Sequence, residues 1–348
     1  MAAPTVHVLD YGAGNVRSVH NAIAAAGFAV ATIATPADLD AARVVVFPGV
    51  GCFAATVDFL DARGFRAPLL AYLRSGRPFM GVCLGMQTLF DASAEAPGAR
   101  GLGLVPGLVA RLAPADGASV PHMGWNGAAA AAPGAVPALA PLGAPGARAY
   151  FVHSFAALPD ARNAAWVAAT TDYGGQRFVS AVARGNVFAT QFHPEKSGRL
   201  GLAVFRAFLA AAAVAPLRPL DDAGPPPEPA LAARLLDAAA PRTRVARRVV
   251  ACLDVRSNDA GDLVVTKGDQ YDVREAGGAG VRNLGKPVEL CARYYAEGAD
   301  EICVLNITAF RAEPLADEPM LRVLEAASER VFVPLTVRRG GARGDGAW

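Results

Sequence analysis

A chain of 348 residues with 53% hydrophobic side chains is long enough for two domains, each with a core of its own. Charged residues make up 18% and the formal net charge is +2, so neither a nucleic-acid partner nor a nucleic-acid-binding surface is expected. The apolar stretch over residues 127–149 is broken repeatedly by proline and glycine, so no membrane span is expected.

Cysteine usage and the start of the chain bear on its location. The five cysteines are an odd number without the spacing of a disulfide framework, which indicates reduced thiols. The first expected strand lies so close to Met1 that no signal or transit peptide is expected ahead of it. Both observations predict a cytoplasmic location.

The first third of the chain alternates strands and helices. We expect strands over residues 5–10, 29–33 and 44–47, with a helix over residues 16–26 that Gly27 ends. The run Val44 to Phe47 is continuously apolar, which suits the middle of a parallel sheet. The pattern predicts an α/β fold.

A glycine-containing loop, Gly49-Val50-Gly51, follows that third strand after Pro48. Its glycines would let backbone N–H groups approach a ligand closely, as in an oxyanion hole. An ordinary turn between a strand and a helix remains the alternative. The carboxyl ends of parallel strands are where ligands bind in open sheets, and Cys83 is expected at such an end as well.

Cys83 stands in the sequence Gly81-Val82-Cys83-Leu84-Gly85, which predicts a strand, a sharp turn and a helix. Glycines on both sides permit a backbone bend at which a Cβ atom would clash. The start of a helix favours the thiolate form of a cysteine. The alternative is a buried structural cysteine. The spacing of the glycines favours a nucleophile.

The next part of the chain is expected to be irregular over residues 91–107 and then rich in hairpins. Strands are expected over residues 149–154, 165–171, 177–184 and 187–192. The last strand runs into His193-Pro194-Glu195, where we expect an extended segment with both ionisable side chains on one side. His193 could take a proton from Cys83 while Glu195 orients the imidazole, as in a hydrolase triad.

Residues 5–212 resemble class I glutamine amidotransferases, and in particular the glutaminase part of imidazole glycerol phosphate synthases. The motifs that carry the resemblance are LDYGAGN at 9–15, FPGVG at 47–51, GVCLGMQ at 81–87, PHMGWN at 121–126, YFVHS at 150–154 and QFHPEKSG at 191–198. The resemblance implies a flavodoxin-like mixed sheet with helices on both faces.

The same resemblance implies that Cys83, His193 and Glu195 hydrolyse glutamine through a thioester and release ammonia, without a metal or another cofactor. It places the substrate against Gln87, Ser154 and the backbone of Gly49, Val50 and Gly51. Residues 123–126 would face the partner domain, forming an intramolecular interface between glutaminase and cyclase.

We expect the glutaminase domain to cover residues 1–213 and a linker rich in proline and alanine to cover 214–246, with one short helix over 231–239. Residues 247–348 again alternate strands and helices. Strands are expected over 248–254, 263–267, 301–306 and 331–336, and helices over 288–297 and 320–330.

Residues 247–348 resemble the start of the cyclase barrel of the same synthases. The motifs are VVACLDVR at 249–256, VTKGDQYDVRE at 265–275, GKPVEL at 285–290, GADE at 298–301, LNIT at 305–308 and VPLTV at 333–337. The resemblance implies that Asp254 is an acid–base carboxylate, that Lys267 lies near the substrate and that Arg248 and Glu301 gate an ammonia channel. The substrate would be the phosphoribulosyl-formimino-AICAR nucleotide, and the products imidazole glycerol phosphate and AICAR.

The sequence matches only the first three strands of that (β/α)₈ barrel, whose usual length is about 250 residues. We therefore expect an incomplete barrel fragment, truncated after the third strand at Val337, and an inactive cyclase half. Two other functions remain open. The chain could be a non-catalytic interaction protein that keeps the fold, or a glutaminase that serves a different synthase.

Overall fold

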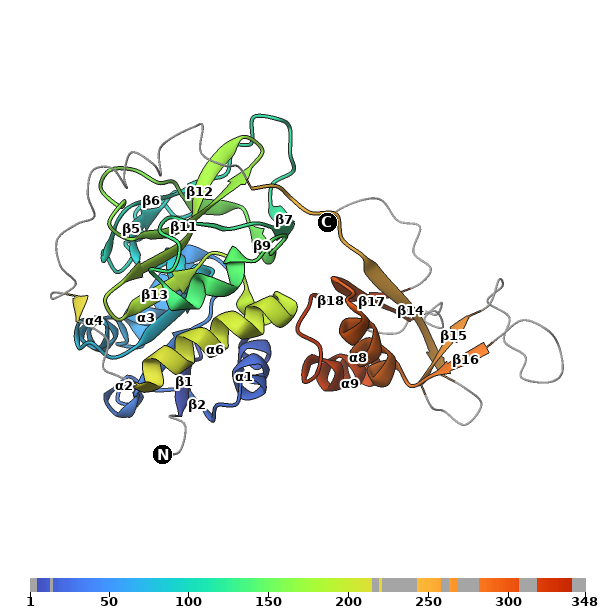
Figure 1. Cartoon of the computed structure of the whole chain (residues 1–348). Coiled ribbons are helices and arrows are strands. Elements are labelled where there is room, and N and C mark those ends of the chain that lie inside the picture. The colour runs from blue at the N-terminus through green and yellow to red at the C-terminus, as the bar shows by residue number, and fades with distance from the viewer. Residues whose placement is uncertain are drawn as a thin grey trace. The chain divides into compact units, whose positions relative to one another are not determined.

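The computed structural model describes residues 5–12, 15–214, 219–220, 243–257, 263–267, 282–306 and 318–339. The chain divides into two compact units, Met1–Ala246 and Arg247–Trp348, shown in Figure 1. Most of the expected linker over 214–246, including the helix expected over 231–239, lies outside the described residues.

The first unit is built on an eight-stranded sheet in the order β2-β1-β3-β4-β13-β12-β11-β8. The strands β1, β2, β3, β4 and β13 are parallel, and β12, β11 and β8 continue the sheet in antiparallel pairs. This is the mixed sheet that the resemblance to class I glutamine amidotransferases implies. The bounds are β1 Val6–Leu9, β2 Val30–Ile33, β3 Val44–Phe47, β4 Phe79–Val82, β8 Ala129–Ala130, β11 Val167–Tyr173, β12 Gln176–Arg184 and β13 Val187–Thr190.

Helices cover this sheet. Their bounds are α1 Val16–Ala25, α2 Asp38–Ala41, α3 Phe53–Ala62, α4 Arg66–Arg74, α5 Leu84–Gln87 and α6 Gly198–Val214. In the view of Figure 1, α1 and α6 lie in front of the sheet and α3 behind it. All residues of β3 and β4 are buried, because both faces of these central strands are covered. Apolar side chains therefore run without interruption along both strands.

Two smaller sheets complete the first unit. One joins β10 Phe155–Ala157, β6 Val105–Arg111 and β5 Phe90–Ser93, and the other pairs β7 His122–Asn126 with β9 Ala149–His153. The prediction of an irregular segment over residues 91–107 is therefore wrong at both ends, since β5 and β6 reach into it. The 3₁₀ helix η1 Pro137–Gly143 lies between β8 and β9 along the chain. The 3₁₀ helix η2 Pro194–Lys196 lies between β13 and α6.

The last residues of the expected linker belong to the first unit. Val245 forms a bridge with Asn126 at the edge of β7, and the N–H of Ala246 donates to the carbonyl of Trp125 at 2.7 Å. Thr243 exchanges hydrogen bonds with Asp172 of β11. Thr243 is thus anchored by bonds between backbone and side chain, and Val245 and Ala246 by backbone bonds.

The second unit contains a five-stranded sheet in the order β16-β15-β14-β17-β18. The strands β14 Val250–Ser257, β17 Glu301–Asn306 and β18 Leu335–Arg339 are parallel, and β15 Leu263–Lys267 and β16 Arg282–Gly285 form an antiparallel extension. Its helices are α8 Pro287–Glu297 and α9 Glu318–Ser328. The strand expected over 331–336 begins only at Leu335, because Pro334 has no N–H to contribute to a ladder.

Side chains alternate along the central strands of this second sheet. Leu253 and Val255 of β14, and Ile302 and Val304 of β17, are buried, whereas Cys252 is exposed and Asp254 half-buried. Asp254 therefore lies on the less covered face. Among the helices of the described ranges, none is long and apolar enough to cross a membrane.

Candidate active site

Cys83 occupies a strained turn between β4 and α5. Its φ is 52° and its ψ −105°, and within the described ranges it is the non-glycine residue with a positive φ. Its N–H donates to the carbonyl of Thr190 on the neighbouring strand β13 at 2.7 Å, which ties the turn to the sheet. The side chain is buried but has 7% of its surface exposed. A single strained residue that the surroundings hold in place is typical of a nucleophile turn.

Glycines around the turn allow very close backbone contacts. A Cβ atom on Gly85 would lie 2.0 Å from the carbonyl oxygen of Phe47, and one on Gly49 would lie 2.5 Å from the nitrogen of Gly85. The loop after β3 therefore packs directly against the turn that carries Cys83. The sequence predicts this neighbourhood from the positions of both segments at strand ends.

We expect Gly85→Ala to lower the free energy of unfolding by about 3 kcal/mol or more, because the added methyl group would collide with backbone rather than with a movable side chain. Urea unfolding followed by tryptophan fluorescence measures the change. Gly143→Ala is the matched control, because a Cβ atom there meets nothing within 4 Å. Equal stability of the Gly85→Ala chain and the parent would contradict the close contact.

His193 and Glu195 form a completely buried pair. The Nδ1 of His193 donates to Glu195 Oε1 at 2.7 Å, and the side-chain amide of Asn15 donates to the same oxygen. Residues Pro194–Lys196 form the 3₁₀ helix η2, so the expected extended segment is wrong. The tight turn, which proline at its first position favours, brings two residues only two apart into contact.

Burial alone would lower the pKa of His193, but the charges of Glu195 and Cys83 outweigh burial and raise that pKa. Burial likewise opposes ionisation of Glu195, yet the charge of His193 and the hydrogen bonds hold the pKa of Glu195 below its ordinary value. The Nε2 of His193 has no hydrogen-bond partner in the described part of the chain. Glu195 thus orients an imidazolium whose second nitrogen is available to a reacting group.

The loop after β3 does not present a completed oxyanion hole. The N–H of Leu84, the residue after the nucleophile, donates to the carbonyl of Gly49 at 3.3 Å. The N–H of Val50 donates to the hydroxyl of Tyr11 at 2.9 Å, and that hydroxyl donates to the carbonyl of Val50 at 2.7 Å. An oxyanion hole at such a turn takes one N–H from the residue after the nucleophile and one from the loop. The N–H groups of Leu84 and Val50 are both occupied in this structure.

Two glutamines connect the turn to β10. The amide nitrogen of Gln87 donates to the carbonyl of Phe155 at 2.9 Å and to Gln191 Oε1 at 3.0 Å, while Gln191 Nε2 donates to Cys83 Sγ at 3.4 Å. Ser154, the other residue expected to contact glutamine, lies between β9 and β10 and is half-buried. Gly51 follows Val50 in the loop with a φ of 123°.

The sequence predicts no role for three residues at this site. They are Tyr11, Asn15 and Gln191, and each contacts a residue for which the sequence does predict a role. Tyr11 and Asn15 belong to the motif LDYGAGN, and Gln191 opens QFHPEKSG. The motifs indicate that these segments matter for the family resemblance, but only the fold shows what the three side chains contact.

A second polar cluster, formed by side chains of β7 and β9, is buried next to the site. His122 Nδ1 and His153 Nε2 lie 3.1 Å apart, and His153 Nδ1 lies 3.0 Å from the carbonyl of Phe155. Since a carbonyl only accepts, His153 carries its proton on Nδ1 and accepts from His122. Burial lowers the pKa of both histidines to about 3. Both are neutral at pH 7.

This neutral pair predicts loss of stability in mild acid. The unfolded chain protonates each histidine near pH 6.5, whereas the folded chain does so only near pH 3, so stability falls as the pH falls through this window. Within this window each histidine changes the free energy of unfolding by about 1.4 kcal/mol per pH unit. The free energy of unfolding in urea should therefore drop by about 2 to 3 kcal/mol between pH 6 and pH 5, and His153→Gln should lessen the drop by about half. An equal drop in that variant would contradict the assignment.

The expected residues of the second unit lie at two places on its sheet. Arg248 and Glu301 form an ion pair with 2.6 Å between Nε and Oε1, beside the start of β14 and β17. Asp254 lies farther along β14, paired in register with Leu305. Lys267 ends β15, and its side chain lies outside the described residues. The structure thus joins Arg248 to Glu301 and separates that pair from Asp254 along the strand.

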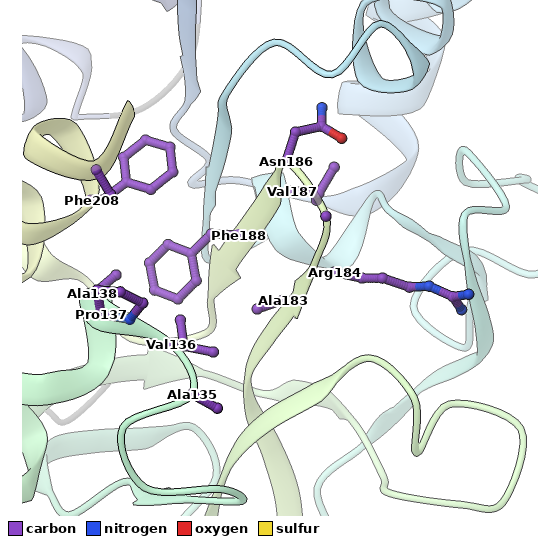
Figure 2. Close-up of a pocket in the computed structure, with 12 residues that line it drawn as sticks. Ala135, Val136, Pro137, Ala138, Ala183, Arg184, Asn186, Val187, Phe188 and Phe208 are labelled. Atoms are coloured by element: carbon purple, nitrogen blue, oxygen red, sulfur yellow. The ribbon is translucent and has the colours of Figure 1, made fainter. Parts of the chain in front are cut away.

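A cavity of about 320 Å³ lies away from the triad, between η1, the β12–β13 turn and α6. Figure 2 shows its wall, where the ring of Phe188 lies between Phe208 and Val136. Its lining contains neither a nucleophile nor an acid. In the described ranges, moreover, no three acidic, histidine or cysteine side chains are grouped to hold a metal ion. The triad is therefore the candidate site for catalysis.

Comparisons with known proteins find a matching family for each of the two units. A family model described as glutamine amidotransferase class-I matches residues 7–212, and one described as histidine biosynthesis protein matches residues 248–345. The chain is 49% identical over 207 residues to imidazole glycerol phosphate synthase subunit HisH of Deinococcus radiodurans, which covers 60% of this chain and 94% of the subunit.

Longer relatives match both units at once. The chloroplastic imidazole glycerol phosphate synthase hisHF of Arabidopsis thaliana is 47% identical over 336 residues, which cover 96% of this chain and 53% of the relative. The hisHF synthase of Schizosaccharomyces pombe is 48% identical over 96% of this chain and 60% of its own length. The chain thus spans about half to three fifths of these relatives. Because one relative is named as chloroplastic, the cytoplasmic location stays a prediction.

Proposed function

This chain belongs to the class-I glutamine amidotransferase family within the imidazole glycerol phosphate synthases, and we propose that its residues 5–212 hydrolyse the side-chain amide of glutamine. The observation that carries the proposal is the buried His193–Glu195 pair beside Cys83 in its strained turn. The products are glutamate and ammonia, and the ammonia serves histidine biosynthesis.

The reaction follows from the roles that the geometry supports. The Cys83 thiolate attacks the amide carbon, and the carbonyl electrons move to oxygen. His193 then gives a proton to the departing nitrogen, which leaves as ammonia while a glutamyl thioester forms on Cys83. In the second half His193 takes a proton from water, the resulting hydroxide attacks the thioester, and the thiolate departs from glutamate. Glu195 stabilises the imidazolium throughout, and Asn15 holds Glu195.

The oxyanion formed in each half needs backbone donors that are occupied in this structure. We infer that the loop over residues 48–51 must turn so that the N–H of Val50 leaves Tyr11 and the carbonyl of Gly49 leaves the N–H of Leu84. Hydrolysis of glutamine by the chain alone is then slow, because the competent loop is a minor state.

Tyr11→Phe should raise this basal glutaminase rate. The hydroxyl makes two hydrogen bonds to Val50, and each such bond contributes about 1 kcal/mol net. Loss of both, about 2 kcal/mol, should favour the turned loop by roughly thirtyfold. Glutamate formation at saturating glutamine measures the effect. Tyr72→Phe is the matched control, since its buried hydroxyl also donates to a backbone carbonyl but does not contact the loop. An unchanged or lower rate in Tyr11→Phe would contradict the proposal that the Tyr11 hydroxyl restrains the loop.

For the second unit we propose the first part of a (β/α)₈ barrel. The parallel strands β14, β17 and β18 with α8 and α9 between them support this assignment. In this proposal Asp254 is an acid–base carboxylate toward the phosphoribulosyl-formimino-AICAR nucleotide, Lys267 lies near that substrate, and the Arg248–Glu301 pair gates ammonia. An intramolecular interface between glutaminase and cyclase belongs to the same proposal.

The prediction of an inactive cyclase half has no support from the comparisons, because relatives matched across nearly the whole chain are named as synthases. Ammonium salt supplied with the nucleotide substrate bypasses Cys83, so formation of imidazole glycerol phosphate under these conditions measures the cyclase reaction alone. Any such activity should be absent from an Asp254→Asn chain, whose glutamine hydrolysis should stay unchanged.

A further inference from the structure

Gln191 is a buried residue to which the proposed mechanism gives no role. It follows β13 and precedes His193 by two positions, and none of its surface is exposed. Its backbone N–H donates to the carbonyl of Ser180 at 2.9 Å, which fixes the main chain against β12. Its Nε2 lies 3.4 Å from the sulfur of Cys83, a distance suited to a hydrogen bond with sulfur. A buried amide is thus directed at the reacting atom.

The orientation of this amide follows from the hydrogen bonds around it. The carbonyl of Phe155 can only accept, so the atom of Gln87 beside it must be the amide nitrogen. The second proton of that nitrogen points at Gln191, which must present its oxygen there. Turning the amide of Gln191 over would set two NH₂ groups against each other. The Gln191 nitrogen therefore faces Cys83, and the sulfur accepts.

We propose that Gln191 is a catalytic residue that holds the Cys83 thiolate by donating its amide N–H to the sulfur, and that Gln87 is the positioning residue that fixes its orientation. This inference rests on the proposed function, in which Cys83 is the nucleophile. A donor at the sulfur favours the thiolate before attack and stabilises it again when the thioester breaks. It also restrains the side chain relative to His193.

Substitution of Gln191, Gln87 or Ser180 leaves the other ionisable groups around the sulfur unchanged. His193, with Glu195 behind it, faces Cys83 from the segment after β13, and Tyr11 faces it from the segment after β1. A change in the pH dependence of Cys83 in Gln191→Met therefore reports loss of the amide, whereas Gln191→Glu adds a negative charge at the same place.

The test is the pH profile of Cys83 alkylation by iodoacetamide in the full chain, followed by mass spectrometry of the Cys83 peptide. Exposed Cys52 serves as the internal reference in each sample. We expect the midpoint of the Cys83 profile to rise by about one pH unit in Gln191→Met, by more in Gln191→Glu and by less in Gln87→Met. The Cys52 profile should not move.

Ser180→Ala is the matched control, because its buried hydroxyl has no hydrogen-bond partner among the described residues and does not contact the sulfur. It should leave the Cys83 midpoint in place. Thermal unfolding of each variant identifies any chain that does not fold, and the use of both Gln191→Met and Gln191→Glu keeps the test decisive. Unchanged Cys83 midpoints in folded Gln191 variants would overturn the proposal.

Steady-state kinetics separate this inference from the proposed function. Gln191→Met should lower kcat for glutamine hydrolysis about tenfold with little change in KM, because the amide contacts the nucleophile. If the parent chain hydrolysed no glutamine but its alkylation midpoint still depended on Gln191, the proposed function would fail while the thiolate contact stood. Normal hydrolysis with midpoints independent of Gln191 would reject the contact and leave the triad intact.

Discussion

Replacement of Cys83 by alanine is expected to lower the rate of glutamine hydrolysis by at least about a thousandfold. The side chain supplies the sulfur on which the thioester forms, and neither Glu195 nor the backbone can replace it. Release of glutamate from glutamine measures the loss. Near-normal activity in Cys83→Ala would show that the nucleophile lies elsewhere.

The remaining cysteines provide controls for that result. Cys52 lies just before α3 and is exposed, and Cys252 is exposed in the second unit. Cys52→Ala and Cys252→Ala should each keep the parent rate. The free energy of unfolding of Cys83→Ala should stay close to that of the parent, because only the sulfur is removed and the Cβ atom that strains the turn is kept.

Replacement of His193 by alanine is expected to cost about as much as loss of Cys83, because without the imidazole no group protonates the departing nitrogen or activates water. The double variant Cys83→Ala with His193→Ala should be no slower than either single variant, since the two residues act as a unit. Assays of the three variants side by side test this. Additive losses would mean that the two residues contribute to separate steps.

The half-buried His20 on α1 is the control for the histidine substitution. His20→Gln replaces an imidazole of the same unit without contacting Glu195 and should keep the parent rate. A comparable loss in His20→Gln would point to a general effect on folding rather than to proton transfer.

The sequence predicts the central sheet well because burial on both faces leaves a plain apolar signal. The expected strand over residues 44–47 coincides with β3, and the glycine spacing around Cys83 predicts the strand, turn and helix that the structure contains. The resemblance to the imidazole glycerol phosphate synthases is confirmed by the comparisons. These features depend on local sequence alone.

The features that the sequence does not predict depend on contacts between distant segments. The strand β5 has only four residues, and Pro106 and Gly107 interrupt the apolar pattern of β6, so the sequence shows little periodicity in either strand. The bonds of Val50 to Tyr11 and of Gln191 to Cys83 join residues 39 and 108 positions apart. Whether the N–H groups of the loop are free or occupied is likewise a property of the fold, because a glycine-rich segment permits both arrangements.

The most direct test of the account is covalent labelling of the parent chain by a diazo-ketone analogue of glutamine, with peptide mapping by mass spectrometry. Such an analogue reacts only where a glutamine site and an activated thiolate coincide. We expect a single adduct on the peptide that contains Cys83, suppressed by excess glutamine, with Cys52 and Cys252 unlabelled although both are exposed. An unlabelled Cys83, or label spread over the exposed cysteines and indifferent to glutamine, would contradict the assignment of a glutamine-hydrolysing triad.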